Sequence, residues 1–343
     1  MKAAIWYGPG RIEVETVPDP IPGPADLLLK IICCNICGSD LRTYLSGSSS
    51  IKPGTILGHE FAGQVVSAPE GSGFSPGDVV TAAQDINCGD CGYCRHGLEH
   101  ICQNKLEFGK HFPGAFAELM VVPETALAKG WVRKLPPGMT PEEASLVEPA
   151  SSCVHTLAIT PRRPGQAVLI IGAGPIGCLH GELAKAAGAG LVLLADTAED
   201  RLNMAERFGF DACLNARQTE FREQVFRLCP GGVDLAISAN PSPAAIIQAI
   251  DLVRKAGIVV AFGGLPKGDP WLTIDGNRIH YDEIVLMGSY AYSRRENDEA
   301  LARILKRDIH PELYITDVLP LDSIREGFER ARAGRALKLQ IRP

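Results

Sequence analysis

The sequence predicts two domains, a mostly antiparallel β domain and an α/β domain with a parallel sheet. Up to about residue 150, short apolar segments are broken by Pro and Gly, which is typical of antiparallel strands. From about residue 151, strand-like and helix-like segments alternate, which indicates a parallel sheet covered by helices on both faces. The 343 residues suffice for two domains of ordinary size.

The predicted strands of the first domain include residues 27–32, 63–67 and 78–82. The second domain is predicted to contain six strands, at residues 167–171, 191–195, 211–214, 233–238, 257–262 and 283–288. Its predicted helices are residues 151–159, 175–187, 198–208, 219–228 and 243–254. The remaining chain is expected to form helices at 296–306 and 323–333 and a strand at 337–341.

Composition excludes several classes of function. Hydrophobic residues make up 45% of the chain and charged residues 22%, the profile of a globular protein. The net charge is −6 and no long basic run occurs, so neither nucleic acid nor an anionic membrane is an expected partner. No apolar run approaches the roughly 20 residues that span a bilayer. Because Gly8-Pro9 interrupts the N-terminal segment before a signal-like stretch develops, a cytoplasmic location is predicted.

Four of the eleven cysteines, Cys88, Cys91, Cys94 and Cys102, form a C-x2-C-x2-C-x7-C cluster. Four thiolates in a short loop suit a tetrahedral structural Zn²⁺ with no open position. The bacterial iron–sulfur pattern has a shorter last gap followed by Pro, whereas Gln103 follows here. A nucleic-acid-binding zinc ribbon needs a basic surround, which this loop lacks. The scattered Cys153, Cys178, Cys213 and Cys229 are interpreted as core residues.

A glycine-rich turn, Gly172-Ala173-Gly174-Pro175-Ile176-Gly177, follows the strand predicted at 167–171 and opens a helix. In this context Gly172 permits the tight turn, Gly174 lets the backbone approach a pyrophosphate, and Gly177 allows close packing of helix on strand. The helix N-terminus then offers free N–H groups to the phosphates. The turn predicts a dinucleotide site.

Asp196 ends the next predicted strand, where a carboxylate can accept hydrogen bonds from both ribose hydroxyls. It would repel the 2′-phosphate of NADP. Arg201, the nearest basic residue that could hold that phosphate, lies one helical turn further on. We therefore expect NAD rather than NADP.

A second metal site is predicted from Cys37 and the pair His59-Glu60. A buried carboxylate at Glu60, beside the apolar Phe61, needs a cation partner, which a metal ion would supply. Glu148 is a further carboxylate in an apolar stretch at the expected domain boundary, where ligand sites tend to form.

These motifs, in this order, resemble the zinc-dependent medium-chain alcohol dehydrogenases, especially sorbitol and other polyol dehydrogenases and threonine dehydrogenase. The resemblance covers essentially the whole chain. It implies a GroES-like catalytic domain at residues 1–150, completed by residues 290–343, and a Rossmann NAD-binding domain at 151–289. It further implies that Cys37, His59 and Glu148 ligate a catalytic zinc, so each subunit would hold two Zn²⁺ ions. Glu60 would act as an alternative ligand or through the zinc-bound water, and Ser39 would start the proton relay.

The implied reaction is hydride transfer from a secondary alcohol to NAD, giving a ketone. The expected substrate is a polyol, sugar alcohol, cyclitol or sugar acid; L-threonine or another amino alcohol is the alternative. Two positions depart from the family pattern: Arg42 stands where relatives often carry a relay His, and Ala291 falls where sorbitol dehydrogenases carry Arg. The basic pair Arg294-Arg295 lies nearby and is interpreted as a solvated turn rather than a site for acidic substrates. The resemblance also implies a homotetramer or homodimer.

Overall fold

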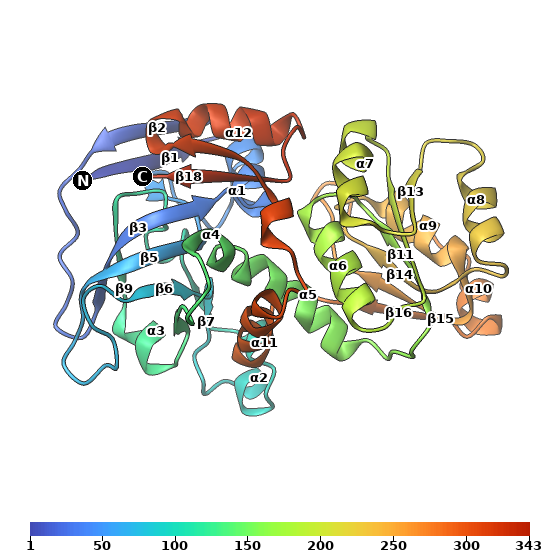
Figure 1. Cartoon of the computed structure of the whole chain (residues 1–343), viewed down its shortest axis with the longest axis horizontal. Helices are drawn as coiled ribbons and strands as arrows, with labels where there is room; N and C mark the ends of the chain where they lie inside the picture. Colours follow the sequence, from blue (N-terminus) through green and yellow to red (C-terminus); the bar gives the residue numbers. More distant parts are fainter. The chain divides into compact units, whose positions relative to one another are not determined.

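A computed structural model describes all residues from 1 to 343, and the chain divides into two compact units (Figure 1). The first unit comprises Met1–Ser151 and Ala291–Pro343, and the second comprises Ser152–Tyr290. None of the helices combines the length and the apolar character needed to cross a membrane.

The first unit is built on strands that are almost all antiparallel. Its largest sheet has the order β10-β6-β5-β3-β18-β17, with β9 also paired to β3; a second sheet has the order β2-β1-β4, and β7 pairs with β8. Only β17 and β18 run parallel. The strands are β1 (Lys2–Gly8), β2 (Arg11–Thr16), β3 (Leu27–Asn35), β4 (Thr55–Ile56), β5 (Glu60–Ser67), β6 (Val79–Ala82), β7 (Asp85–Ile86), β8 (Leu106–Glu107), β9 (Leu119–Val122), β10 (Val132–Lys134), β17 (Ile315–Pro320) and β18 (Lys338–Arg342). The helices are α1 (Gly38–Ser46), α2 (Gly92–Arg95), α3 (Glu124–Ala128), α4 (Pro141–Ala144), α11 (Arg294–Leu305) and α12 (Ile324–Arg332).

Aromatic packing joins the C-terminal segment to the N-terminal strands. Phe328 of α12 is fully buried, and its ring centroid lies 4.8 Å from that of Tyr44 and 6.0 Å from that of Phe116. These side chains share one core with the alternating apolar residues of β3, such as Leu27 and Leu29. Burial of large aromatic side chains supplies much of the energy of such a core. The last 53 residues therefore complete the first unit.

The register of the central strands brings together residues from distant parts of the sequence. Asn35, at the end of β3, pairs with Glu60 of β5 on one side and with Gln340 of β18 on the other. Lys338 lies two residues before Gln340, on the same strand. This arrangement positions the residues of the candidate metal centre.

The second unit contains a six-stranded parallel sheet of order β13-β12-β11-β14-β15-β16, with helices on both faces (Figure 1). On β11, Leu169 and Ile171 pack with the core formed by α8 and α9. Ile170 points to the opposite face, toward Gly177 of α6. The strands are β11 (Ala167–Ile171), β12 (Leu191–Asp196), β13 (Ala212–Asn215), β14 (Val233–Ser238), β15 (Val253–Ala261) and β16 (Val285–Gly288). The helices are α6 (Pro175–Ala186), α7 (Glu199–Ala205), α8 (Phe221–Leu228), α9 (Pro243–Leu252) and α10 (Gly276–Tyr281).

The sequence prediction was wrong about the start of one helix. The helix expected from residue 151 is α5 (Val147–Ile159), which begins at Val147 and therefore places Glu148 in its first turn. Pro149 lies in this first turn. Proline is tolerated in the first turn because the N–H that it lacks would have no partner within the helix.

Replacing Phe328 by Ala is expected to destabilise the protein by about 3–5 kcal/mol, the usual cost of removing a buried phenyl ring. Denaturant unfolding measures this change. Leu305→Ala on α11 is the matched control, since Leu305 is 40% exposed and its truncation should cost less than about 1 kcal/mol. Equal effects of the two substitutions would contradict the proposed anchoring role of α12.

Candidate active site and metal centres

The glycine-rich turn joins the carboxyl end of β11 to α6, next to the position where the strand order reverses. A Cβ atom at Gly177 would lie 1.7 Å from the carbonyl oxygen of Gly172, so only glycine permits this contact. A Cβ at Gly174 would meet no atom within 4 Å, which leaves the backbone there open to a ligand. Pro175 and Ile176 form the partly exposed first turn of α6. The turn fits the pyrophosphate of a dinucleotide.

Asp196 ends β12 beside this turn. Its Oδ2 accepts a hydrogen bond from the backbone N–H of Ala173 (2.7 Å), and its Oδ1 accepts one from Ala198 (2.9 Å). Burial lowers the pKa of Arg201, while the charge of Asp196 opposes that shift. The carboxylate is therefore fixed against the turn, at the position where the ribose of a dinucleotide would lie.

A second group of predicted residues meets in the first unit. Cys37, His59 and Glu60 each offer a ligand atom, and these three atoms lie within 4.8 Å of one another. Cys37 caps α1, while His59 and Glu60 lie at the start of β5. Gly58 has φ +96°, and a Cβ there would lie 2.9 Å from the Sγ of Cys34, so glycine is required where the chain turns into His59.

Asp40 orients two of these groups. Its Oδ2 accepts a hydrogen bond from the backbone N–H of Cys37 (3.1 Å), and its Oδ1 lies 3.5 Å from Nδ1 of His59. Burial alone would lower the pKa of His59, but the charges of Asp40 and Cys37 raise it well above its usual value. The imidazole is therefore held in an anionic pocket, with a carboxylate behind it as in many metal-binding histidines.

Glu60 is fully buried and forms an ion pair with Lys338, whose Nζ donates to both carboxylate oxygens. Lys338 is itself only 2% exposed. Burial alone would lower the pKa of Lys338, but the charges of Glu60 and Cys37 raise it. The ammonium therefore stays protonated beside the cluster.

Glu148 lies beside this group, in the first turn of α5, and it is also buried. Burial raises its pKa to about 7. The charges of His59 and Lys338 lower this pKa, and the charge of Glu60 raises it. The hydroxyl of Tyr292 hydrogen-bonds to Glu148 and accepts the backbone N–H of Gln84 (3.2 Å). Ser39 lies in the exposed first turn of α1.

The donor set suits a zinc ion. A thiol, an imidazole and two carboxylates gather in a buried region. One of the carboxylates, that of Glu60, is paired with the ammonium of Lys338. Burying this many acidic groups is costly unless cations balance them. Cys, His and carboxylate ligands are those that Zn²⁺ takes in catalytic sites. Cys37, His59 and either glutamate could therefore hold the metal.

The four-cysteine cluster is already arranged around a centre. The Sγ of Cys91 lies 3.5 Å from that of Cys94 and 3.9 Å from that of Cys102, and the Sγ of Cys88 lies 3.4 Å from that of Cys102. Tetrahedral coordination with Zn–S bonds of about 2.3 Å requires sulfur–sulfur separations of about 3.8 Å. The geometry fits one zinc ion.

Hydrogen bonds and burial shift the pKa values of two of these thiols in opposite directions. Backbone N–H groups lower the pKa of Cys91 to about 6, whereas burial raises that of Cys102 to about 12. The Sγ of Cys102 accepts N–H bonds from Cys88 (3.2 Å) and Asn104 (3.4 Å). Cys102 therefore needs the charge of a metal ion to ionise at neutral pH.

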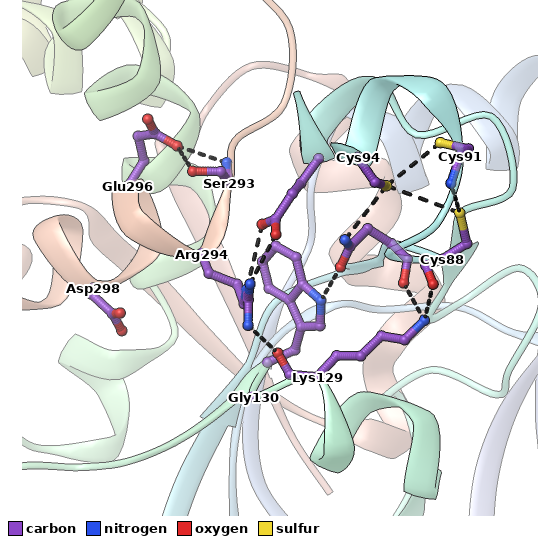
Figure 2. A network of polar contacts seen from close by, with 12 residues as sticks. Cys88, Cys91, Cys94, Lys129, Gly130, Ser293, Arg294, Glu296 and Asp298 are labelled. Atoms are coloured by element: carbon purple, nitrogen blue, oxygen red, sulfur yellow. Dashed lines mark hydrogen bonds and ion pairs between the residues drawn. The ribbon is translucent and has the colours of Figure 1, made fainter. Parts of the chain in front are cut away.

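The segment that carries the four cysteines, residues 88–102, is here called the lobe. A polar network holds it to its surroundings (Figure 2). Lys129 donates to the backbone carbonyls of Asn87 and Cys88, each at 2.7 Å. Arg294 of α11 bonds the carboxylate of Glu99 (2.9 Å) and the carbonyl of Lys129 (2.8 Å). The basic residue Arg294, interpreted from sequence as part of a solvated turn, thus ties α11 to the lobe.

Two family descriptions match the chain. Residues 23–135 match the alcohol dehydrogenase GroES-like domain, and residues 175–306 match the zinc-binding dehydrogenase description. The chain belongs to the zinc-dependent medium-chain alcohol dehydrogenase family. The predicted fold class, a GroES-like domain with a Rossmann domain, is therefore confirmed.

Several relatives resemble the chain over its full length. The L-threonine 3-dehydrogenase of Pyrococcus horikoshii is 34% identical, over 99% of this chain and 96% of that protein. The sorbitol dehydrogenase of Halalkalibacterium halodurans is 29% identical, over 100% of this chain and 99% of that protein. A structure described as a zinc-binding dehydrogenase of Sinorhizobium meliloti, bound to NADP, has a TM-score of 0.90 and 30% identity, with 100% of this chain and 99% of that chain covered.

Sequence reasoning missed two residues of this dehydrogenase. Lys338 lies 278 residues after Glu60, with which it pairs, and no local motif marks it. Tyr292 follows Ala291, the position that departs from sorbitol dehydrogenases, and no sequence motif indicates its contact with Glu148. The available signal was a lysine between two leucines, Leu337 and Leu339, in the predicted strand.

Cys91→Ser is expected to lower the zinc content of the dehydrogenase by about one ion per chain, since a hydroxyl cannot replace the thiolate of a structural site. Metal analysis by mass spectrometry measures it. Cys229→Ser is the control, because Cys229 lies at the end of α8 in the second unit, outside both ligand groups. Unchanged zinc in Cys91→Ser would contradict the assignment of the lobe.

Proposed function

We propose that this zinc-dependent dehydrogenase oxidises a secondary alcohol of the polyol, sugar alcohol, cyclitol or sugar acid class, transferring hydride to NAD and forming a ketone. The observation that carries the proposal is the buried group of Cys37, His59 and the two glutamates. The dinucleotide turn and Asp196 supply a site for the nicotinamide cofactor in the same chain.

Cys37, His59 and Glu148 would hold the zinc ion, with Glu60 as a nearby carboxylate. When bound, zinc is a Lewis acid that lowers the pKa of an alcohol hydroxyl. Asp40 fixes the orientation of His59 and of the backbone at Cys37. Ser39, at the exposed start of α1, would accept the hydroxyl proton and pass it outward. Arg42, also exposed, replaces the relay histidine of relatives, so solvent would take the proton directly.

The polyol class is favoured by the chemistry of the third ligand. A carboxylate at Glu148 is a harder ligand than the thiolate of simple alcohol dehydrogenases. A harder ion accepts a second oxygen more readily, and polyols and sugar acids offer one next to the reacting hydroxyl. Ala291, at the position of an arginine in sorbitol dehydrogenases, argues against sorbitol itself. A substrate complex with only one substrate oxygen near the metal would contradict this reasoning.

L-Threonine is the second candidate substrate, favoured by the names of relatives such as that of Pyrococcus horikoshii. An amino alcohol needs a carboxylate free to bind its ammonium group. Glu60 is already paired with Lys338, and Asp40 accepts from Cys37 and His59. Because these carboxylates already have partners, they are not available to an ammonium group, and the polyol class is our first choice.

NAD is proposed as the cofactor because of Asp196. Its carboxylate is fixed by two backbone N–H groups, so it would meet the 2′-phosphate of NADP at close range. The relative from Sinorhizobium meliloti has NADP bound, so the preference of this chain is a property to be measured.

A homodimer or homotetramer is proposed from the edge of the second unit's sheet. β16 is the outermost strand, and its Val285 and Leu286 are 50% and 37% exposed. Unpaired edge strands with exposed apolar side chains readily pair with a second copy. A cytoplasmic location is also proposed, because all eleven cysteines are present as thiols, which a reducing compartment maintains.

The reaction is tested by following NAD reduction with a panel of polyols, cyclitols, sugar acids, simple alcohols and L-threonine. Turnover on one polyol-like group is expected, and His59→Ala should reduce it by about 1000-fold, because Lewis-acid stabilisation contributes several kcal/mol. His280→Gln on α10 is the control with unchanged turnover. Turnover chiefly on L-threonine would favour the second candidate, and full activity of His59→Ala would contradict the metal mechanism.

Asp196→Asn is expected to shift the ratio of kcat/KM values toward NADP by about tenfold or more, equivalent to about 1.4 kcal/mol, because it removes the charge that opposes the 2′-phosphate. Steady-state kinetics with both cofactors measure the ratio. Asp200→Asn, an exposed change on α7, serves as the control. A ratio that stays constant in Asp196→Asn would show that another group sets the preference.

A further inference from the structure

A narrow hollow lies within the second unit, between two helices and the central part of its sheet. Its apolar wall comes from α5, α6 and β14, through Leu157, Leu183, Ala184, Leu235 and Ile237. Gln166, just before β11, and Ala187, just after α6, also line it. The hollow therefore extends toward the amino end of β11, whereas the dinucleotide turn follows the carboxyl end of that strand.

The space inside the hollow is limited. The lining surrounds about 430 Å³ with the open mouth included, of which about 20 Å³ is wide enough for a water-sized group. A space of the smaller size holds one small group. A slender ligand could therefore enter with one end, while the rest of it lies along the mouth.

One buried nitrogen in the wall has no hydrogen-bond partner. His180 of α6 lines the hollow and is 3% exposed, and its Nε2 is bonded to no atom of the protein. The hydroxyls of Thr156 and Thr160 in the same wall already have partners, in Ser289 (2.7 Å) and in the backbone carbonyl of Thr156 (2.7 Å). His180 is therefore the wall residue with a buried polar atom still to be satisfied.

The ring of His180 is neutral and held in place. Burial lowers the pKa of His180 to about 3, so the imidazole carries no charge at neutral pH. Its ring meets that of Phe262 edge to face, with centroids 4.7 Å apart and an interplanar angle of 83°. A neutral imidazole nitrogen makes one hydrogen bond, as donor or as acceptor. His180 therefore suits a neutral oxygen rather than a buried charge.

Two guanidinium groups line the other part of the hollow. Arg162 and Arg163 are exposed, and neither forms an ion pair. The backbone N–H of Arg163 donates to the side-chain oxygen of Gln166 (3.0 Å), which fixes this loop. Asp234 lies close enough for the charge of Arg163 to act on it, but its carboxylate is bonded to Arg254 (2.7 Å). Both arginines are therefore available to an anion from solution.

The two kinds of polar group lie at different ends of the hollow. The backbone N–H of Gly165 donates to the carbonyl of Gly188 (2.8 Å), which joins the arginine loop to the C-terminal end of α6. His180 lies seven residues before Ala187 on that helix, a distance of about 10 Å at 1.5 Å per residue. A ligand of about four carbons, with a hydrogen bond of about 3 Å at each end, spans this length.

We propose that this hollow binds a short linear carboxylic acid that carries a hydroxyl or keto oxygen at its far end. The carboxylate would bind Arg162 and Arg163 at the mouth, where its charge stays in contact with water. The chain would lie against the apolar wall, and the far oxygen would hydrogen-bond to Nε2 of His180. The site is separate from the metal centre and from the dinucleotide turn, and it does not depend on the proposed function.

The test compares two acids that differ only in the far oxygen, 4-hydroxybutyrate and butyrate. Isothermal titration calorimetry measures their binding to the full-length protein without NAD, so that no turnover occurs. The hydroxy acid should bind the wild-type protein about tenfold more tightly, because its hydroxyl satisfies a buried nitrogen. In His180→Leu the two acids should bind within about twofold of each other, since the partner of the hydroxyl is gone.

A second set of variants tests the charged end. Replacing both arginines, with Arg162→Gln and Arg163→Gln together, should weaken both acids by about tenfold or more. Arg227→Gln on α8 is the matched control and should change neither affinity, because Arg227 does not line the hollow. Thermal melting verifies that each variant folds. If His180→Leu does not fold, His180→Phe replaces it with the same expectation.

The proposal is overturned if 4-hydroxybutyrate shows no binding to the wild-type protein up to about 10 mM. It is also overturned if the preference for the hydroxy acid survives in folded His180→Leu. Unchanged affinity in the double arginine variant would show that the acids bind elsewhere, such as at the metal centre, and would overturn it as well. None of these results bears on the metal centre or on the reaction of the proposed function, so the two accounts fail separately.

Discussion

The structure of the first unit depends on a balance of buried charge. Cys37, Glu60 and Glu148 gather in a largely buried region, where Lys338 forms an ion pair with Glu60 and its charge also acts on Glu148. Uncompensated charges in such surroundings carry a large energetic penalty. A divalent metal ion would add positive charge to this region and, on the proposed function, would act as the Lewis acid for alcohol oxidation.

The chain meets this constraint by joining its two ends in one sheet. The N-terminal segment supplies Cys37 and His59, while the last strand supplies Lys338. Phe328 packs against Tyr44 and so anchors the returning C-terminal segment. The intervening second unit carries the dinucleotide turn on a sheet with its own core. A GroES-like unit and a Rossmann unit thus each keep their own stabilising contacts.

Features encoded by local spacing were predictable from the sequence. The four cysteines lie within fifteen residues, and the turn from Gly172 to Gly177 follows a buried strand, so each motif could be interpreted without the fold. The contacts of Lys338 and Tyr292 could not, because they depend on which strands become neighbours. The predicted start of α5 is four residues late, and Pro149 fits the first turn of a helix but not its interior, so the proline alone does not mark where the helix begins.

The most direct test of this account is a crystal structure of the purified protein with anomalous diffraction at the zinc edge. The account predicts two anomalous peaks in each chain. One should lie among Cys88, Cys91, Cys94 and Cys102, and the other should be coordinated by Cys37, His59 and Glu148, with Glu60 still bound to Lys338. The absence of the second peak would contradict the metal mechanism. A second peak coordinated by Glu60 in place of Glu148 would contradict the assigned roles of the two glutamates.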